Sequence, residues 1–172
     1  THDIRSPLTL IMSPLHKLLR KDLGEDVKEE LKTIEHNASR IQNLVNQILD
    51  IRKIDKQQMK IHCQETDIVQ YVGNILKSYE YTAKERGLTL TYAPAIDRLD
   101  VWLDRNQFDK VVDNLMSNAF KYTYDGGIIE VRIDQTDHYT AELKVIDNGM
   151  GIKGDVNKIF DRFYQGSTSR SL

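Results

Sequence analysis

The chain has 172 residues, of which 40% are hydrophobic and 29% charged, a composition typical of a globular protein with one domain or two small ones. Its 24 basic and 26 acidic residues leave a formal charge of −2, which gives no support to nucleic acid or an anionic membrane as a partner. The only cysteine, Cys63, excludes an intrachain disulfide and favours a reducing, cytoplasmic compartment, and no apolar run approaches the ~18 residues of a membrane span.

The first third of the chain predicts a helical hairpin. Residues 3 to about 22 carry apolar side chains at helical spacing, and the segment around Gly24 has the composition of a turn. From 27 to about 56 the chain lacks Gly and Pro and carries a heptad seam, formed by Leu31, Ile34, Ala38, Ile41, Val45 and Ile48. Because one hairpin cannot cover this seam, we expect two copies to form a four-helix bundle in a homodimer.

After Lys56 the pattern changes to short alternating runs, which are typical of β-strands. The runs predict three strands and a β-hairpin, at residues 59–65, 88–92, 99–103, and 128–134 with 139–147. Together with two further helices, these strands make the second part of the chain α+β. We therefore expect two domains, at residues 1–57 and 58–172.

Two helices with N-terminal caps lie between these strands. Asp67 precedes an apolar periodicity that ends near Gly87. Asp104 precedes a second one, from 105 to about 122, and Gln107 gives it the spacing of a capping box.

The second of these helices carries the segment DNLMSNAFKYT, which places Asn114, Asn118 and Lys121 on one face. This face borders an expected apolar stripe, made of Phe108, Val111, Leu115, Ala119 and Tyr122. A carboxamide oxygen is a hard ligand that suits Mg²⁺, and a lysine one turn away can neutralise a phosphate. On this pattern alone, a merely solvated face is an equal alternative.

The segment VIDNGMGI ends a strand in Asp147 and continues with Gly149 and Gly151. The two glycines let the backbone turn sharply and come close to a ligand. A carboxylate at a strand end can accept a hydrogen bond from an exocyclic amine such as that of adenine. By itself the segment fits a plain turn better, and the aromatic side chains of the later segment IFDRFYQ fit a core.

The opening THDIRSP, the heptad helix, NLMSNAFKYT, DNGMGI and IFDRFYQ follow one another in this order. In this order they resemble the catalytic core of sensor histidine kinases of two-component systems, and HDIRSPLTLI also resembles hybrid kinases. The resemblance implies that the hairpin is the dimerisation and histidine-phosphotransfer domain. It implies that the α+β half is the ATP-binding α/β sandwich shared with the gyrase and Hsp90 superfamily, in a parent protein anchored in the inner membrane.

The resemblance assigns roles to three residues of the opening motif. His2 matches the phosphoacceptor, whose neutral imidazole attacks the γ-phosphate of ATP, and Asp3 matches the acidic neighbour that accepts the imidazole proton. Ser6 stands where the family most often has Thr or Asn, at a position associated with phosphatase activity toward the partner. A hydroxyl there can orient a water, so we expect weak to moderate phosphatase activity.

The resemblance also assigns a site for ATP and Mg²⁺. Asn118 matches the Mg²⁺ ligand, and Asn114 and Lys121 match its partners on the nucleotide phosphates. Tyr122 matches an aromatic residue near the nucleotide, and Asp147 matches the aspartate that reads adenine.

The lid of this site shows the main departure from the family. Gly149 and Gly151 match the start of the lid, and Phe160 and Phe163 match its phenylalanine motif, but the family's second glycine-rich box is missing. We therefore expect an incomplete ATP-binding domain that binds nucleotide weakly and has a mobile lid from about Asn148 onward.

The chain is accordingly expected to phosphorylate itself on His2 and to pass the phosphoryl group to an aspartate of a receiver domain. Two alternatives stay open. One is an ATPase or chaperone-type member of the wider superfamily, against which the histidine motif and the hairpin argue. The other is a non-enzymatic dimerisation module whose nucleotide half is inert.

Overall fold

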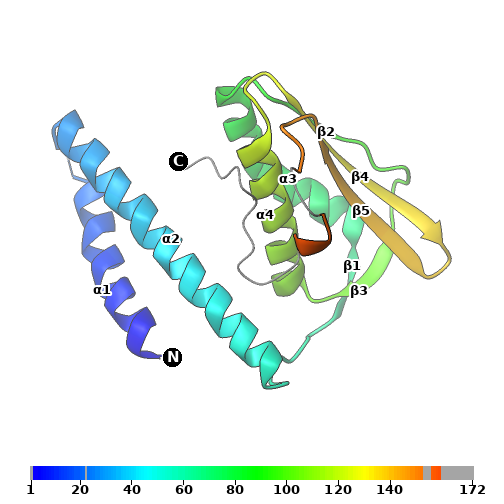
Figure 1. The fold of residues 1–172 in the computed structure, drawn as a ribbon, viewed down its shortest axis with the longest axis horizontal. Coiled ribbons are helices and arrows are strands. Elements are labelled where there is room, and N and C mark those ends of the chain that lie inside the picture. Colours follow the sequence, from blue (N-terminus) through cyan, green and yellow to red (C-terminus); the bar gives the residue numbers. More distant parts are fainter. Residues whose placement is uncertain (1, 22, 153–155, 160–172) are drawn as a thin grey trace. The chain divides into compact units, whose positions relative to one another are not determined.

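The computed structural model describes residues 2–21, 23–152 and 156–159 (Figure 1). The chain divides into two compact units, residues 1–60 and 61–172. Within the described ranges, no helix is both long enough and apolar enough to cross a membrane.

The first unit is a hairpin of two helices, α1 (His2–Leu19) and α2 (Glu25–Asp55), which lie side by side in Figure 1. This confirms the two predicted helices. Leu15 and Ala38 are buried, and His16 Nε2 lies 2.8 Å from Glu35 Oε1.

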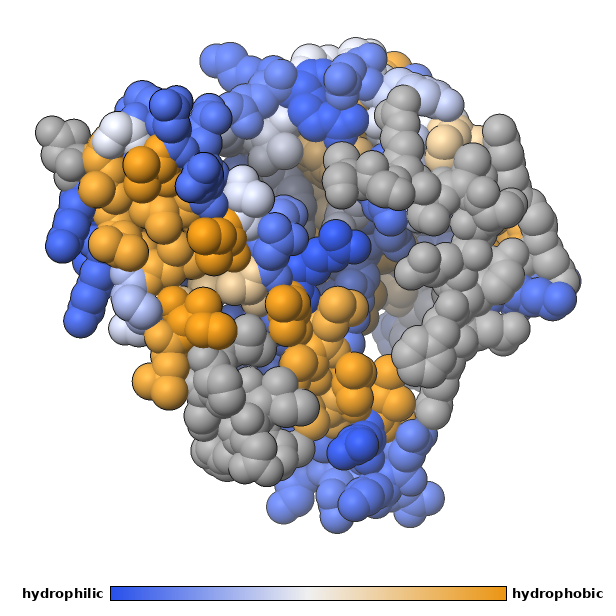
Figure 2. Space-filling model, turned by 60° about the vertical axis from the view of Figure 1, so that its left-hand side comes forward, coloured by the Kyte–Doolittle hydropathy of each residue, from blue (hydrophilic) through white to orange (hydrophobic). Residues whose placement is uncertain are grey.

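The hairpin leaves part of its apolar seam open. Ile34, Ile41 and Ile48 lie seven residues apart on α2, and about half of each side chain is exposed. Figure 2 shows hydrophobic patches between hydrophilic ones on the face of the molecule that it presents. These three heptad residues of α2 are therefore left uncovered by α1.

The second unit is α+β, with elements in the order β1 (Gln64–Asp67), α3 (Ile68–Glu85), β2 (Thr89–Tyr92), β3 (Asp100–Leu103), α4 (Arg105–Tyr122), β4 (Ile128–Asp137), β5 (Thr140–Asp147) and the short 3₁₀ helix η1 (Val156–Lys158). Strands β1 and β3 pair antiparallel. Strand β2 pairs parallel with β4, and β4 pairs antiparallel with β5, which gives a second sheet in the order β2-β4-β5.

The core of this unit lies between the three-stranded sheet and the two long helices, which Figure 1 shows on one side of that sheet. Alternate residues of β4, namely Ile129, Val131 and Ile133, are fully buried, as the period of two in a strand requires. Helices α3 and α4 cover them with a set of buried apolar side chains, at Ile68, Val69, Val72, Leu76, Ala83, Val112, Met116, Ala119 and Phe120.

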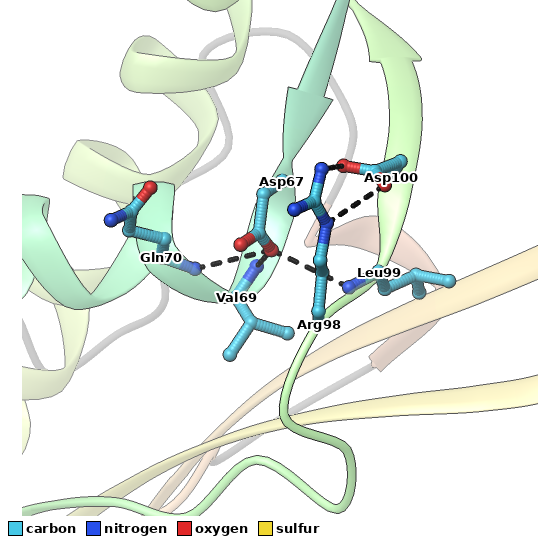
Figure 3. Close-up of polar contacts among 6 residues, drawn as sticks. All are labelled: Asp67, Val69, Gln70, Arg98, Leu99 and Asp100. Carbon is cyan, nitrogen blue, oxygen red and sulfur yellow. Dashed lines mark hydrogen bonds and ion pairs between the residues drawn. The ribbon is translucent and has the colours of Figure 1, made fainter.

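Asp67 caps α3 and also ties the small sheet together (Figure 3). Its Oδ1 accepts hydrogen bonds from the amides of Val69 at 3.1 Å and Gln70 at 3.4 Å, which satisfies donors at the helix start. The same oxygen accepts from the Leu99 amide at 3.4 Å, just before β3. The predicted cap is therefore confirmed, and it also joins the end of β1 to the residue before β3.

Asp104 caps α4, but the predicted capping box is only half formed. Its Oδ1 accepts from the Gln107 amide at 3.2 Å, whereas the Gln107 side chain accepts from Lys110 at 3.3 Å. The Oδ2 atom accepts from the His62 amide at 2.8 Å. These amide donors, His62 first, hold the pKa of Asp104 below its usual value.

The predicted strand at residues 59–65 is wrong at its beginning. Strand β1 starts only at Gln64, because its partner β3 offers four residues, from Asp100 to Leu103. The His62 amide is already bonded to Asp104. The segment before β1 is thus hydrogen-bonded to the N-cap of α4 and does not extend the sheet.

Candidate functional site

Helix α4 turns the three predicted polar residues away from the core. Asn114 and Asn118 are exposed and Lys121 is half-buried, while Met116 and Ala119 are buried on the core side. Among the described residues, neither carboxamide has a hydrogen-bond partner. The two amides are therefore free to contact a ligand.

The predicted apolar stripe of this helix is partly wrong. Val111 is 50% exposed and Leu115 is 38% exposed, although we expected both to be buried. The buried positions are Val112 and Met116, one residue further on, with Phe120. Two apolar stripes run next to each other on α4, and the one that meets the sheet is the one further from Asn114 and Asn118.

Two tyrosine–aspartate pairs hold α4 against α3. Tyr71 donates from its hydroxyl to Asp109 Oδ1 at 2.6 Å, and Tyr79 donates to Asp113 Oδ1 at 2.8 Å. Burial, followed by the bond to Asp109, raises the pKa of Tyr71 to about 12. Burial, followed by the bond to Asp113, also raises the pKa of Tyr79. Because Asp109 and Asp113 are one turn apart, the two bonds fix the position of α4 along α3.

The end of β5 lies against the end of α4. Asp147, the last residue of β5, is exposed, and its Oδ1 accepts from the Gly149 amide at 2.9 Å. The Met150 amide donates to the carbonyl oxygen of Tyr122 at 3.1 Å. The structure thus brings together Asp147, Gly149 and Tyr122, which the sequence assigned to one site.

Gly149 is in contact with the backbone of Tyr122. A Cβ at Gly149 would overlap the carbonyl oxygen of Tyr122 and would stand 2.7 Å from its carbonyl carbon. No side chain fits there, so the glycine is required by the close approach of two backbones. Gly151 adopts a φ of 65°, a left-handed conformation that glycine takes at no cost.

A second pair of residues, which the sequence analysis missed, supports this corner. Asn148 Oδ1 accepts from the Ile128 amide at 2.7 Å, and a Cβ at Gly127 would stand 2.8 Å from the same oxygen. The side chain of Thr123 is buried beside Gly127, and its hydroxyl has no hydrogen-bond partner among the described residues. The DGG segment before β4 indicated a turn that includes Gly127, but nothing in the sequence indicated that Gly127 lies beside Asn148.

The charged groups of the site are arranged around the end of α4. The ammonium of Lys121 lies 5.1 Å from the centroid of the Tyr122 ring, at the last turn of the helix. The described residues contain no group of three His, Cys, Asp or Glu side chains that could hold a metal by itself. A cation here would depend on a carboxamide and on oxygens that a ligand brings, as Mg²⁺ commonly does.

The remaining predicted residues lie elsewhere. His2, Asp3 and Ser6 belong to the first two turns of α1, in the other unit. The expected lid begins at about Asn148. Its first residues are bonded within the domain, since the Asn148 amide donates to the Ile128 carbonyl and the Met150 amide donates to the Tyr122 carbonyl. Phe160 and Phe163 lie outside the described residues.

Comparison with known families assigns both parts of the chain. Residues 1–57 match the family described as the His Kinase A (phospho-acceptor) domain. Residues 103–172 match the family described as the histidine kinase-, DNA gyrase B- and HSP90-like ATPase. The two matches cover the hairpin and the part of the second unit that begins at the end of β3.

Individual proteins resemble the chain in sequence or in fold. Histidine kinase P4 of Formosa agariphila is 35% identical over 96% of the chain, which spans 12% of that relative's length. Histidine kinase AdeS of Acinetobacter baumannii has a similar fold, with a TM-score of 0.66 and 21% identity over 94% of this chain and 79% of its own. The histidine kinase ThkA, solved in complex with the response regulator protein TrrA, has a TM-score of 0.64 and 23% identity over 95% of this chain and 48% of its own.

Proposed function

The chain belongs to the histidine kinase family, and from this premise we propose that it uses ATP to phosphorylate itself on His2 and passes the phosphoryl group to an aspartate of a receiver domain. The observation that carries the proposal is the contact between two segments that are far apart in sequence. The Asp147–Gly149 segment lies against the last turn of α4, which bears Lys121. A carboxylate, bare backbone and a cation thereby meet at one corner of the domain.

The base of the nucleotide would lie at the Asp147 end of this corner. The Gly149 amide donates to Oδ1 of Asp147, which leaves Oδ2 as an acceptor for an exocyclic amine. A Cβ at Gly151 would meet nothing within 4 Å, so there is open space at this end of the corner, and Tyr122 offers an aromatic neighbour for a flat ring. An amine donor at this position distinguishes adenine from guanine, whose corresponding group is a carbonyl.

The phosphates would lie along the exposed face of α4. Lys121 supplies a positive charge, and Asn114 supplies a carboxamide one turn from Asn118. Asn118 fits as the one protein ligand of Mg²⁺, which offsets the charge of the transferred phosphoryl group when it is bound. The exposed, unpaired state of both amides among the described residues supports these roles.

The reaction on His2 is a phosphoryl transfer. A neutral imidazole nitrogen forms a bond to the γ-phosphorus as the bond to the bridging oxygen breaks, and ADP leaves. Asp3 takes the proton from the other ring nitrogen. Ser6 lies one helical turn from His2. In the dephosphorylation of the receiver, its hydroxyl would orient a water toward the aspartyl phosphate.

We further propose that the active form is a homodimer and that the fragment works in the cytoplasm, within a parent anchored in the inner membrane. The open seam of α2 at Ile34, Ile41 and Ile48 supports the dimer. The ThkA complex supports a response regulator as the partner, since that kinase was solved with one. No part of this proposal includes nucleic acid.

The test is transfer of label in two steps. After loading with labelled ATP and removal of free nucleotide, the chain is mixed with a panel of receiver domains and, in parallel, with the same receivers carrying Asn at the acceptor aspartate. We expect label to move to at least one intact receiver and to none of the Asn variants. An ATPase would release phosphate without labelling the chain, and an inert dimerisation module would do neither.

A further inference from the structure

Arg86, the residue directly after α3, makes an unusual group of contacts with the end of α4. Its Nη1 donates to the carbonyl oxygen of Phe120, and its Nη2 donates to that of Thr123 at 2.9 Å. Its Nε donates to Asp125 Oδ1 at 2.8 Å. Its own carbonyl accepts from the Gly126 amide at 3.2 Å. One residue therefore contacts four positions between the last turn of α4 and the start of β4.

These contacts meet a need that every helix end has. The last carbonyls of a helix lack partners within the helix, and together they carry a partial negative charge. The guanidinium of Arg86 supplies both donors and a positive charge to Phe120 and Thr123 at this end. Asp125 completes the arrangement, but it is 77% exposed, so its ion pair should contribute little. The two carbonyl contacts are the important ones.

Tyr122 lies between Phe120 and Thr123 in the sequence, and its carbonyl holds the nucleotide corner. Tyr122 accepts from the Met150 amide and lies in contact with Gly149. If the last turn of α4 loosened, the Tyr122 carbonyl would move away from Met150, and Gly149 would lose its position beside Asp147. The geometry points to Arg86 as a positioning residue for the nucleotide site, acting through the last turn of α4. This inference rests on the proposed role of Asp147 and Gly149 in reading the base.

The contacts also explain why lysine should not replace Arg86. Guanidinium donates in several directions within one plane and reaches Phe120, Thr123 and Asp125 together. An ammonium keeps the charge but is a compact donor on a flexible stem, and it cannot hold the two carbonyls in a fixed geometry. Arg86→Lys therefore separates positioning from charge.

The experiment compares Arg86→Lys with two controls by titration calorimetry. Arg132→Lys is the same substitution at an exposed ion pair with Glu130 on β4, and Asp125→Asn removes only the exposed partner of Arg86. We expect Arg86→Lys to weaken Mg·ATP and Mg·ADP by the same factor of ~10, because both share the base end. Both controls should stay within about twofold of the unmodified chain. A loss limited to Mg·ATP, or no loss, would overturn the inference.

Hydrogen exchange separates positioning from a general loss of stability. In Arg86→Lys the Met150 amide should exchange faster, while the Ile68 amide, bonded to Leu99 at 2.9 Å, should keep its rate. Equal acceleration of both amides would show that Arg86 acts on the fold as a whole and would overturn the inference.

A measurement without any substitution covers the case in which the variant does not fold. Coupling between two sites is reciprocal, so saturating Mg·ADP should slow exchange of the Arg86 Nε proton in the unmodified chain, and leave that of Arg132 unchanged. An unchanged Arg86 proton would contradict the role. If the unmodified chain bound neither nucleotide, the proposed function would fail and this inference with it; if it bound both, and Arg86→Lys bound equally well, only the inference would fail.

Discussion

The carbonyl of Tyr122 lies against the backbone of Gly149, at a separation that leaves no room for a Cβ. This contact joins the last turn of α4 to the loop after β5, and the bond from Met150 to the same carbonyl strengthens it. Residues from two distant segments of the chain are thereby fixed as one corner, in keeping with glycine's ability to let backbones approach closely.

Gly149→Ala should open this corner. The added methyl group would overlap the Tyr122 carbonyl oxygen, and backbone cannot yield as a flexible side chain can. We expect a loss of about 1–3 kcal/mol in the free energy of unfolding and at least ~10-fold weaker binding of Mg·ATP. Gly24→Ala is the matched control, because a Cβ there meets nothing within 4 Å and φ is −55°. Urea unfolding and calorimetry give the two values, and equal effects in both variants would contradict the contact.

Asn118→Ala should weaken Mg·ATP binding more than Asn114→Ala does, by ~10-fold or more, because only Asn118 is proposed to bind the metal. Both side chains are exposed on α4, so neither change should disturb the fold. Titrations with and without Mg²⁺ measure the difference, and the exposed Ser117→Ala serves as control. Equal losses for the two asparagines, or a loss that is independent of Mg²⁺, would reverse the assignment.

Ile41→Glu combined with Ile48→Glu should convert the proposed dimer to monomers. Each of these side chains is about half exposed in the single hairpin, and a dimer would bury them, so two charges per chain would be placed in the seam. Asn43→Glu combined with Gln47→Glu, at two exposed positions, is the control for charge on α2. Light scattering at micromolar concentration decides, and a monomeric unmodified chain would remove the proposal.

Tyr71→Phe should change how stability depends on alkaline pH. The pKa of Tyr71 rises from 10.0 to about 12 in the folded chain. Between these values the unfolded tyrosine ionises and the folded one does not, so the stability that Tyr71 contributes is complete below pH 10 and is lost as the pH rises toward 12. The Phe variant lacks this loss, so its free energy of unfolding should fall less steeply.

Urea unfolding at several pH values from 9 to about 12 tests this expectation. At neutral pH the variant should also lose about 1 kcal/mol, because the bond to Asp109 is gone. Tyr139→Phe, at a side chain that is 94% exposed, controls for general effects of removing a hydroxyl. Parallel pH profiles for the unmodified chain and Tyr71→Phe would show that the folded Tyr71 titrates normally.

Local patterns were enough to predict most elements of the fold. Asp67 and Asp104 predicted the starts of α3 and α4, because an N-cap and an apolar repeat of 3.6 residues are local features of a sequence. The start of β1 could not be found in this way. Its limit depends on the length of β3 and on where the His62 amide is bonded, and both are set some 40 residues later in the chain.

Candidate site residues could be chosen from the sequence, but the contacts that hold their helix in place could not. Asn118 and Asp147 stand out by residue type and position, whereas the wrong choice of Val111 and Leu115 arose because α4 has two adjacent apolar stripes. Contacts such as Tyr71–Asp109 and Arg86–Phe120 join residues 38 and 34 positions apart. No periodicity reports such pairs, so only the fold could show that they hold α4 in place.

The identity of the phosphorylated residue tests the account most directly. The chain is incubated with Mg²⁺ and γ-labelled ATP, and protein-bound label is tested for stability in acid and in base. We predict acid-labile, base-stable label that disappears in His2→Gln and persists in His16→Gln, a change in the same helix at a residue paired with Glu35. Label that survives in His2→Gln, or that is stable to acid, would contradict His2 as the phosphoacceptor.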